Sequence, residues 1–339
     1  MTRFQRARIV DIARHAKVGT ATVDRVLNDR PHVSPATRRR VLHAISELES
    51  DFAEVAPSRQ WRLQVLLPAD AGPSTEFLAQ CFGAIAAKRL VRIECEAIKK
   101  IEPEALAAKL GECVGRRVDA VAFQALDDPR VRDAVSKLAQ AKIPSLALLS
   151  GLENSGVIGR IGIDNRAAGR TAGYIMGRML PQSGLVAVVT GSLLYSLHED
   201  RETGFRSMLR RQFPHLRTVG VCSGYDDIEG NYRAVGELMR HHPELAGIYN
   251  VGGGNEGIVR ALQDHPNNAL LYIGHNLTHK TQGYLLSGAM DIILHQNMRR
   301  IAKQAVAAIV ARLEGQPVTI ETLPTEIITR ENLLGAVFE

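Results

Sequence analysis

The first fifty residues of this 339-residue chain carry the pattern that most restricts its fold, because three short helices follow one another there in quick succession. Over 9–16, apolar residues recur at the i, i+3, i+4, i+7 spacing of one helical face. Val18-Gly19 interrupts that spacing and predicts a tight turn. A second helix is predicted over 20–28, with these apolar residues facing inward: Val23, Val26 and Leu27.

A third helix is predicted after a break at Pro31, which cannot continue a helix. Ser34-Pro35 has the form of an N-cap followed by proline at the first helical position. The apolar face expected for this helix consists of Val41, Leu42, Ile45 and Leu48. Two helices that are joined by a tight turn and braced by a third can place the outer face of the second helix in the major groove of DNA.

The segment VDIARHAKVGTATVDRVLNDRPHVSPATRRRVLHAISELE resembles the DNA-binding headpiece of the LacI-type (LacI/GalR) repressor family. The family pattern is roughly D-V-A-x-x-A-x-V-S-x-x-T-V-S-R-V-L-N, followed by V-S-x-x-T-R-x-x-V. The agreeing residues are Asp11, Ala13, Ala16, Val18, Thr22, Val23, Arg25, Val26, Leu27, Asn28, Val33, Ser34, Thr37, Arg38 and Val41. The alternative is a small helical bundle with another role. The resemblance implies a helix-turn-helix regulator of transcription.

The same resemblance assigns the base-reading positions to Thr20 and Ala21, short side chains that suit contacts with the thymine methyl group. Arg25 is long enough to reach guanine or phosphate. Asp24 departs from the common serine, and it either accepts from cytosine, orients Arg25, or is an outward residue held by a neighbour. The expected DNA-binding residues are Thr20, Ala21, Thr22, Arg25, Asn28 and Arg38.

Charge and composition agree with a DNA-binding protein of the cytoplasm. The net charge is +6, and basic residues outnumber acidic ones from Met1 to Arg62, which favours a polyanionic partner. The polar N-terminus is not a signal peptide, and no run of eighteen apolar residues predicts a membrane span. The four cysteines form no C-x-x-C pair and are expected to be buried, reduced thiols.

A hinge or linker over 50–61 is expected to join the headpiece, 1–49, to the remainder, 62–339. In the resembling family a hinge helix with the pattern P-N-x-x-A-x-x-L inserts leucines into the minor groove. That pattern is absent here, and no leucine lies between Leu48 and Leu63. We therefore expect no leucine wedge. Phe52 and Val55 are the bulky apolar residues that offer an alternative wedge.

From Trp61 onward, short apolar strands alternate with helical segments, which predicts an α/β fold with doubly wound parallel sheets. Two series of similar length, separated near 161–164, indicate two lobes. The motifs IGIDNRAAGRTAG, VVTGS with HEDRETGFRSML, and IGHNLT with ILHQN resemble the periplasmic-binding-protein-like sensor domain of the same family. That resemblance implies an effector site between the lobes and a dimer built by this domain.

Ligands of open parallel sheets bind at the carboxyl ends of the strands, and polar residues follow several predicted strands here. Amides, a carboxylate and an arginine suit a hydroxyl-rich ligand, since each hydroxyl both donates and accepts. Aromatic rings would cover its apolar faces. The expected effector-binding residues are Phe77, Gln124, Asn165, Tyr195, His198, Arg201, Asn250, Asn255, His275 and Gln296. For each one alone, a helix-capping or loop role is the alternative.

Other motifs point away from catalysis. The run G-G-G-N-E-G at 252–257 satisfies G-x-G-x-x-G, but the strand after it ends in His275-Asn276 rather than in an acidic residue. We interpret it as a tight turn into a helix that lines the cleft. His241-His242 lacks further metal ligands at a suitable spacing and is expected at a solvated helix end. No cofactor, metal or enzymatic activity is expected.

The sequence therefore predicts a cytoplasmic, homodimeric, ligand-responsive regulator of transcription, most simply a repressor. It would bind a pseudo-palindromic DNA operator and respond to a sugar or polyol held between two lobes. A solute-binding protein of a sugar transport system is the alternative, and the N-terminal helices oppose it. The sequence names neither the effector nor the operator, and it leaves the sign of the response open.

Overall fold

The structure, a computed structural model, describes residues 9–27, 33–52, 60–69, 71–86, 91–99, 102–152, 155–191, 194–222, 226–265 and 270–333. The chain divides between Arg59 and Gln60 into two compact units, each with its own core. Of the predicted features, Asn28 and the linker residues 53–59 lie outside the described part of the chain. Among the helices that the structure describes, none is long and apolar enough to cross a membrane.

The first unit consists of α1 (Ile9–His15), α2 (Thr20–Leu27) and α3 (Pro35–Phe52), as predicted. Its core is formed by Ile12, Ala13, Ala16, Val23, Val26, Val41 and Ala44. Lys17, with φ 53°, makes the turn after α1, and the Gly19 carbonyl accepts the Thr22 N–H at 2.9 Å as α2 begins. Ser34 caps α3 by accepting the Thr37 N–H at 3.1 Å, which confirms the predicted N-cap.

One expectation for α3 was inaccurate. Leu42 is 52% exposed, whereas Val41 and Ala44 are buried against α1 and α2. Val41 and Ala44 are three residues apart and share one helical face, and Leu42 is turned away from it by about 100° per residue. The helix also runs to Phe52, so the expected headpiece boundary at residue 49 falls inside α3.

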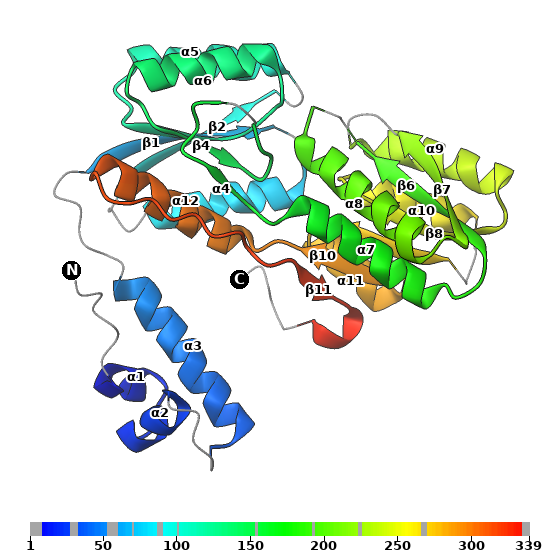
Figure 1. The fold of residues 1–339 in the computed structure, drawn as a ribbon, viewed down its shortest axis with the longest axis horizontal. Helices are drawn as coiled ribbons and strands as arrows, with labels where there is room; N and C mark the ends of the chain where they lie inside the picture. The colour runs from blue at the N-terminus through cyan, green and yellow to red at the C-terminus, as the bar shows by residue number, and fades with distance from the viewer. Residues whose placement is uncertain are drawn as a thin grey trace. The chain divides into compact units, whose positions relative to one another are not determined.

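The first lobe of the second unit is built on a five-stranded parallel sheet in the order β2-β1-β3-β4-β5. The strands are β1 (Trp61–Pro68), β2 (Val91–Ile98), β3 (Ala120–Gln124), β4 (Ser145–Leu148) and β5 (Arg160–Ile161). Its helices are α4 (Pro73–Ala86), α5 (Pro103–Gly115), α6 (Pro129–Gln140) and α12 (Met298–Leu313). The pair α5 and α6 covers one face of the sheet, and α4 with α12 covers the other (Figure 1).

The second lobe is built on a six-stranded sheet in the order β11-β10-β9-β8-β6-β7, parallel except for β11. Its strands are β6 (Gly184–Thr190), β7 (Leu216–Cys222), β8 (Leu245–Asn250), β9 (Leu271–His275), β10 (Ile292–His295) and β11 (Glu326–Ile328). Its helices are α7 (Asn165–Met179), α8 (Ser196–Gln212), α9 (Ile228–His241), α10 (Asn255–Asp264) and α11 (His279–Ser287), with the 3₁₀ turn η1 (Arg330–Asn332). The two predicted doubly wound sheets are thus confirmed.

Alternating side chains of the central strand β6 explain why helices cover both faces of this sheet. Val186 and Val188 belong to the core packed under α7 and α8. Leu185, Ala187 and Val189 belong to a second core, under α9, α10 and α11. Because both faces are buried, the strand is a continuous apolar run, as in the interior of parallel sheets generally.

The lobes are not consecutive in sequence, which the two predicted series did not foresee. After β10 the chain returns to the first lobe, where α12 packs against α4, and it then crosses back to add β11 to the second sheet (Figure 1). Two crossing segments pair in parallel at Ile163 and Leu323, and the Leu323 N–H donates to Gly162 at 3.1 Å. The chain therefore crosses between the lobes three times.

The expectation of buried cysteines holds for Cys81 and Cys113 and was wrong for Cys95, which is exposed. Cys95 lies on β2, the edge strand, where most side chains between Val91 and Ile98 are uncovered. The side chain of Cys222 lies outside the described residues.

Candidate functional site

A cleft in the second unit consists of two adjoining chambers, each lined by both lobes. The inner chamber has a volume of about 70 Å³ and the outer one about 420 Å³. The residues that line both chambers are Ala71, Ser74, Asp226, Gly252, Gly253 and Asn276. These residues follow β1, β7, β8 and β9, so the cleft lies at the carboxyl ends of the strands, as predicted for an open parallel sheet.

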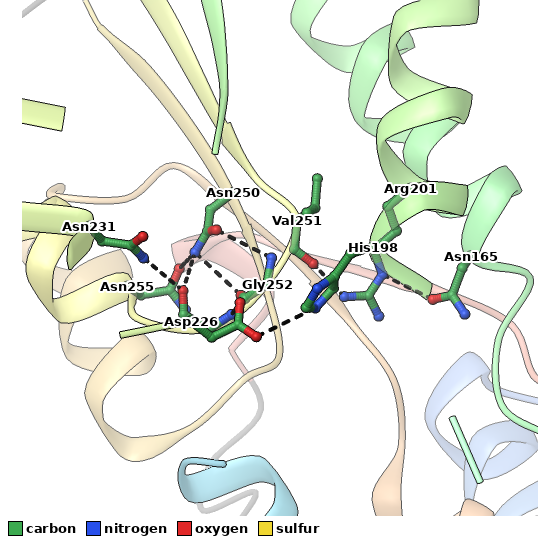
Figure 2. A network of polar contacts seen from close by, with 10 residues as sticks. Asn165, His198, Arg201, Asp226, Asn231, Asn250, Val251, Gly252 and Asn255 are labelled. Carbon is green, nitrogen blue, oxygen red and sulfur yellow. Dashed lines mark hydrogen bonds and ion pairs between the residues drawn. The ribbon is translucent and has the colours of Figure 1, made fainter. Parts of the chain in front are cut away.

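Arg201 is the most buried charged residue of the inner chamber, with only 2% of its surface exposed. Its Nε donates to Asn165 Oδ1 at 2.9 Å, and its Nη1 donates to the Val251 carbonyl at 2.7 Å (Figure 2). Its Nη2 has no hydrogen-bond partner among the described residues. Burial lowers the pKa of Arg201 to about 10, so the side chain remains charged at neutral pH. The N–H groups of Nη2, on a fixed cation that lines the chamber, therefore have no partner among the described residues.

Close packing of α7 on α8 holds Arg201 in this position. A Cβ on Gly169 of α7 would lie 2.0 Å from the Arg201 carbonyl oxygen, and one on Gly204 of α8 would lie 2.2 Å from the Arg166 carbonyl oxygen. The two backbones approach this closely because neither glycine carries a side chain. Asn165 is the first residue of α7, and the Asp164 side chain caps that helix. The spacing between the helices therefore sets the bond between Arg201 and Asn165.

Asp226 is a site residue that the prediction did not include. It follows β7, its φ of 54° is left-handed, and its side chain is 11% exposed. Its Oδ1 accepts the Gly253 N–H at 3.0 Å, and its Oδ2 lies 3.8 Å from His198 Nε2 (Figure 2). The same rule that selected His275, a polar residue at the carboxyl end of a strand, would have selected Asp226 had it been applied to β7.

Two tyrosine hydroxyl groups contact polar side chains of the second lobe that line the cleft. The Tyr249 hydroxyl lies 2.8 Å from His275 Nε2, and His275 Nδ1 has no partner among the described residues. Burial, with the charge of Arg201 acting in the same direction, holds the pKa of His275 well below its ordinary value. The imidazole is therefore neutral. Tyr272 donates to Asn255 Oδ1 at 2.7 Å and fixes that amide in the same way.

The structure brings most of the predicted effector residues together. The inner chamber is lined by Gln124, Tyr195, His198, Arg201 and Gln296. The outer chamber is lined by Asn255 and His275. Asn165 and Asn250 line neither chamber but hydrogen-bond to residues that do. Asn165 accepts from Arg201, and Asn250 donates to Asn255 at 2.8 Å. His198 and Arg201 lie on α8, which begins at Ser196.

Phe77 lies outside both chambers. Helix α4 reaches the cleft only through its first turn, at Pro73, Ser74 and Thr75. Phe77 lies further along the helix, where the guanidinium carbon of Arg299 is 5.3 Å from the centre of its ring. The aromatic side chain that does line the inner chamber is Tyr195.

The glycine run adopts the predicted turn into a helix. Gly254 is left-handed, with φ 69°, and α10 begins at the next residue. Gly252, Gly253 and Gly254 line the outer chamber. His241 ends α9, and its Nδ1 lies 2.7 Å from the Glu237 carbonyl. Within the described part of the chain, no group of three or more His, Cys, Asp or Glu side chains is placed to hold a metal ion.

In the first unit, α2 presents the side chains that the sequence assigned to DNA. Thr20, Ala21 and Arg25 are exposed, and Thr22 is half-buried. Arg38 is half-buried on α3. Val23 and Val26, on the opposite face of α2, are fixed in the core. The exposed face is thus held on a rigid support.

Known proteins match both units. Residues 8–49 match the lacI family of bacterial regulatory proteins, and residues 75–317 match the periplasmic binding protein domain. The chain belongs to the LacI family of bacterial regulators. It is 28% identical over 247 residues to the ribose operon repressor of Halalkalibacterium halodurans, covering 71% of this chain and 70% of the relative. It is 24% identical over 352 residues to the transcriptional repressor PurR of Yersinia enterocolitica, covering 98% of each.

Among solved structures, an ABC transporter solute-binding protein of Burkholderia graminis, in complex with D-arabinose, matches with a TM-score of 0.76. It is 24% identical and covers 82% of this chain and 98% of its own, a likeness that concerns the fold alone. The helix-turn-helix unit separates this protein from the transport alternative. The protein is a ligand-responsive, DNA-binding repressor, and its relatives are repressors and sugar-binding proteins rather than enzymes.

Proposed function

We propose that this LacI-family repressor acts in the cytoplasm as a homodimer on a pseudo-palindromic operator, and that a sugar or polyol in the cleft controls its affinity for DNA. The observation that carries the effector assignment is Arg201, a fixed, buried cation whose Nη2 is unpartnered in the inner chamber. A buried donor without a partner costs free energy that a ligand oxygen can recover.

The neighbours of Arg201 favour a hydroxyl-rich ligand over an apolar one. Gln124 Oε1 is buried without a partner and offers an acceptor, and Asp226 offers a carboxylate with one hydrogen bond from the protein. Asn276 and Gln296 add amides. A hydroxyl group donates to one such partner and accepts from another, so a polyol satisfies both kinds at once. The ring of Tyr195 gives the chamber an apolar face.

The proposed DNA contact is the exposed face of α2. Thr20 and Ala21 are short, which suits close approach to base edges, and Arg25 is the long cation on the same helix. Twofold symmetry of a dimer would repeat this face on two half-sites, roughly 34 Å or a multiple of it apart. The operator is expected to be a pseudo-palindrome for that reason.

The test uses the full-length protein and an operator selected from random-sequence DNA. Fluorescence anisotropy would measure operator affinity with and without each member of a sugar and polyol panel, after thermal-shift screening of the same panel. A ligand present at 100 times its Kd would stabilise the protein by about 2.7 kcal/mol. A selected operator sequence without twofold symmetry would contradict the proposal that the protein binds DNA as a homodimer. A panel that leaves both Tm and operator affinity unchanged would contradict the effector class.

A matched pair of variants on α8 sharpens this test. Arg201→Gln should abolish the thermal shift and the change in operator affinity while leaving the affinity of the unliganded protein for DNA intact. Arg206→Gln is the control, because Arg206 bonds Glu202 and Thr218 and lines neither chamber. Equal ligand affinity in the two variants would remove Arg201 from the site.

A further inference from the structure

Asp226 occupies the junction between the two chambers and is held there by three glycines. A Cβ on Gly191 would lie 2.1 Å from Asp226 Oδ1, a Cβ on Gly252 would lie 2.0 Å from the same oxygen, and one on Gly253 would lie 3.1 Å from the Asp226 Cβ. Gly191 follows β6, and Gly252 and Gly253 follow β8, so the carboxylate extends from the edge strand β7 across the ends of two neighbouring strands.

The close approach of these glycines leaves the carboxylate packed directly against backbone. Asp226 adopts a left-handed φ of 54°, a conformation that aspartate and asparagine tolerate better than most residues. An ionised carboxylate has about four acceptor positions, and one of these takes the Gly253 N–H. Oδ2 lies 3.8 Å from His198 Nε2 (Figure 2). Asp226 therefore retains acceptor capacity toward a ligand at the junction.

Asp226 and Asp200 are the carboxylates whose charges act on Arg201 in the direction that favours the charged guanidinium, and of these two Asp226 lines the inner chamber. Neither hydrogen bond of the Arg201 side chain goes to a carboxylate, because its partners are an amide oxygen and a backbone carbonyl. Among the described residues that line the inner chamber, Asp226 is the one acidic side chain. The two opposite charges leave the chamber close to neutral before a ligand arrives.

The outer chamber adds negative charge. Asp227 and Glu256 line it together with Asp226, whereas Lys280 is the lysine that lines it and is paired with Glu256. A ligand phosphate or carboxylate in either chamber would therefore face at least one carboxylate in a partly enclosed site, where screening by solvent is reduced.

We propose that Asp226 selects the effector by charge: it accepts hydrogen bonds from hydroxyl or ammonium groups of the ligand and excludes sugar phosphates and sugar acids. The effector class is then the free sugar or amino sugar, and the repressor distinguishes a sugar from the product of its phosphorylation or oxidation. This inference rests on the proposed function of the cleft as a sugar site, and it goes beyond that function by assigning the charge of the ligand.

The experiment compares matched ligands on the full-length protein. Thermal shift and then titration calorimetry would be run with D-glucose, D-glucosamine, D-gluconate and D-glucose 6-phosphate, and with D-ribose, D-arabinose, D-ribose 5-phosphate and D-arabinonate. Wild type is expected to bind neutral or amino members and to give no shift with the anionic member of the same set. Tight binding of any phosphate or acid by wild type would overturn the proposal.

Asp226→Asn tests the assignment to this residue. Asparagine keeps the left-handed backbone and nearly the same volume, so the variant removes the charge with little change of shape. Affinity for the neutral ligand should fall roughly ten- to a hundredfold, because hydrogen bonds to a charged group are lost. Affinity for the matched acid should rise, since the carboxylate that opposes an anion in the inner chamber is then removed while Arg201 keeps its charge. Unchanged affinity for both would overturn the proposal and leave the sugar site standing.

Asp128→Asn is the matched control. Asp128 lines neither chamber, and its Oδ1 accepts the Arg130 N–H at 2.9 Å as the N-cap of α6, a role that asparagine also fills. This variant should keep the wild-type preference for neutral ligands. The same change of preference in both variants would contradict a specific role of Asp226. If neither wild type nor either variant bound any of these compounds, the proposed function itself would be contradicted.

Discussion

Adding one methyl group at Gly169 should disable the effector site from outside the cleft. The Cβ of Gly169→Ala would lie 2.0 Å from the carbonyl oxygen of Arg201, 2.8 Å from its carbonyl carbon and 2.9 Å from its Cα. These are backbone atoms of α8 and cannot rotate away. The two helices must separate until the closest of these distances approaches the 3.4 Å of an ordinary contact.

The expected magnitude follows from two opposing contributions. Alanine in a helix interior is favoured over glycine by about 1 kcal/mol. Overpacking of a close helix contact costs roughly 1–3 kcal/mol, and a contact that involves backbone on both sides belongs at the upper end. We therefore expect a net destabilisation of about 2 kcal/mol, which corresponds to a fall in Tm of roughly 3–4 °C for a unit of this size.

The separation should also lengthen the bond between Arg201 Nε and Asn165 Oδ1, now 2.9 Å, because these residues belong to the two separating helices. Ligand affinity measured by calorimetry should fall, while operator affinity of the unliganded protein should stay close to wild type. Gly111→Ala on α5 is the control, since a Cβ there meets nothing within 4 Å and should raise stability. If Gly169→Ala matched Gly111→Ala in Tm and kept wild-type ligand affinity, the close contact of α7 and α8 would not position Arg201.

Burial lowers the pKa of His295 to about 4. Below pH 6.5 the His295 side chain takes up a proton in the unfolded chain but not in the folded one. The free energy of unfolding should therefore fall by about 1.4 kcal/mol per pH unit down to about pH 4. Denaturant titration should show a less steep fall in His295→Asn. Tyr249→Phe should cost about 1–3 kcal/mol in urea unfolding, because the hydroxyl that contacts Nε2 of buried His275 is lost. An unchanged unfolding midpoint would contradict this prediction. Arg25→Ala should weaken specific operator binding by about 1–3 kcal/mol, unlike Arg39→Ala on α3, and equal losses would remove Arg25 from base reading.

Features that are decided by residues close together in sequence were predicted correctly. The start of α3 was predicted correctly from Ser34-Pro35, because serine accepts a backbone N–H at the N-cap and proline suits the first helical position. The rule that ligands meet strand ends selected Gln124 and His275 correctly as residues of the cleft. In these cases, the residues that decide the structure are neighbours in sequence.

The position of Asp226 depends on residues that the sequence does not bring together. Its carboxylate fits where it does because Gly191, Gly252 and Gly253 leave space, and those glycines follow two other strands. Strand order in the sheet, β8-β6-β7, makes them neighbours. Without that order, Asp226 is one more acidic residue in a polar loop. Burial of Leu42 was wrongly expected for a related reason, since only tertiary contacts decide which face of α3 meets α1 and α2.

The division of charge between the lobes bears on how a ligand would act. Arg201 and Asp226 both belong to the second lobe, whereas the first lobe lines the inner chamber with uncharged residues such as Ser74 and Gln124. Charge-assisted hydrogen bonds are roughly twice as strong as neutral ones, so we expect most of the affinity for a ligand to come from the second lobe. A ligand shifts a conformational equilibrium only through contacts that differ between the two states. If the lobes separated when the ligand left, contacts with the second lobe alone would persist. We therefore propose that contacts with Ser74 and Gln124 of the first lobe would couple the ligand to such a movement.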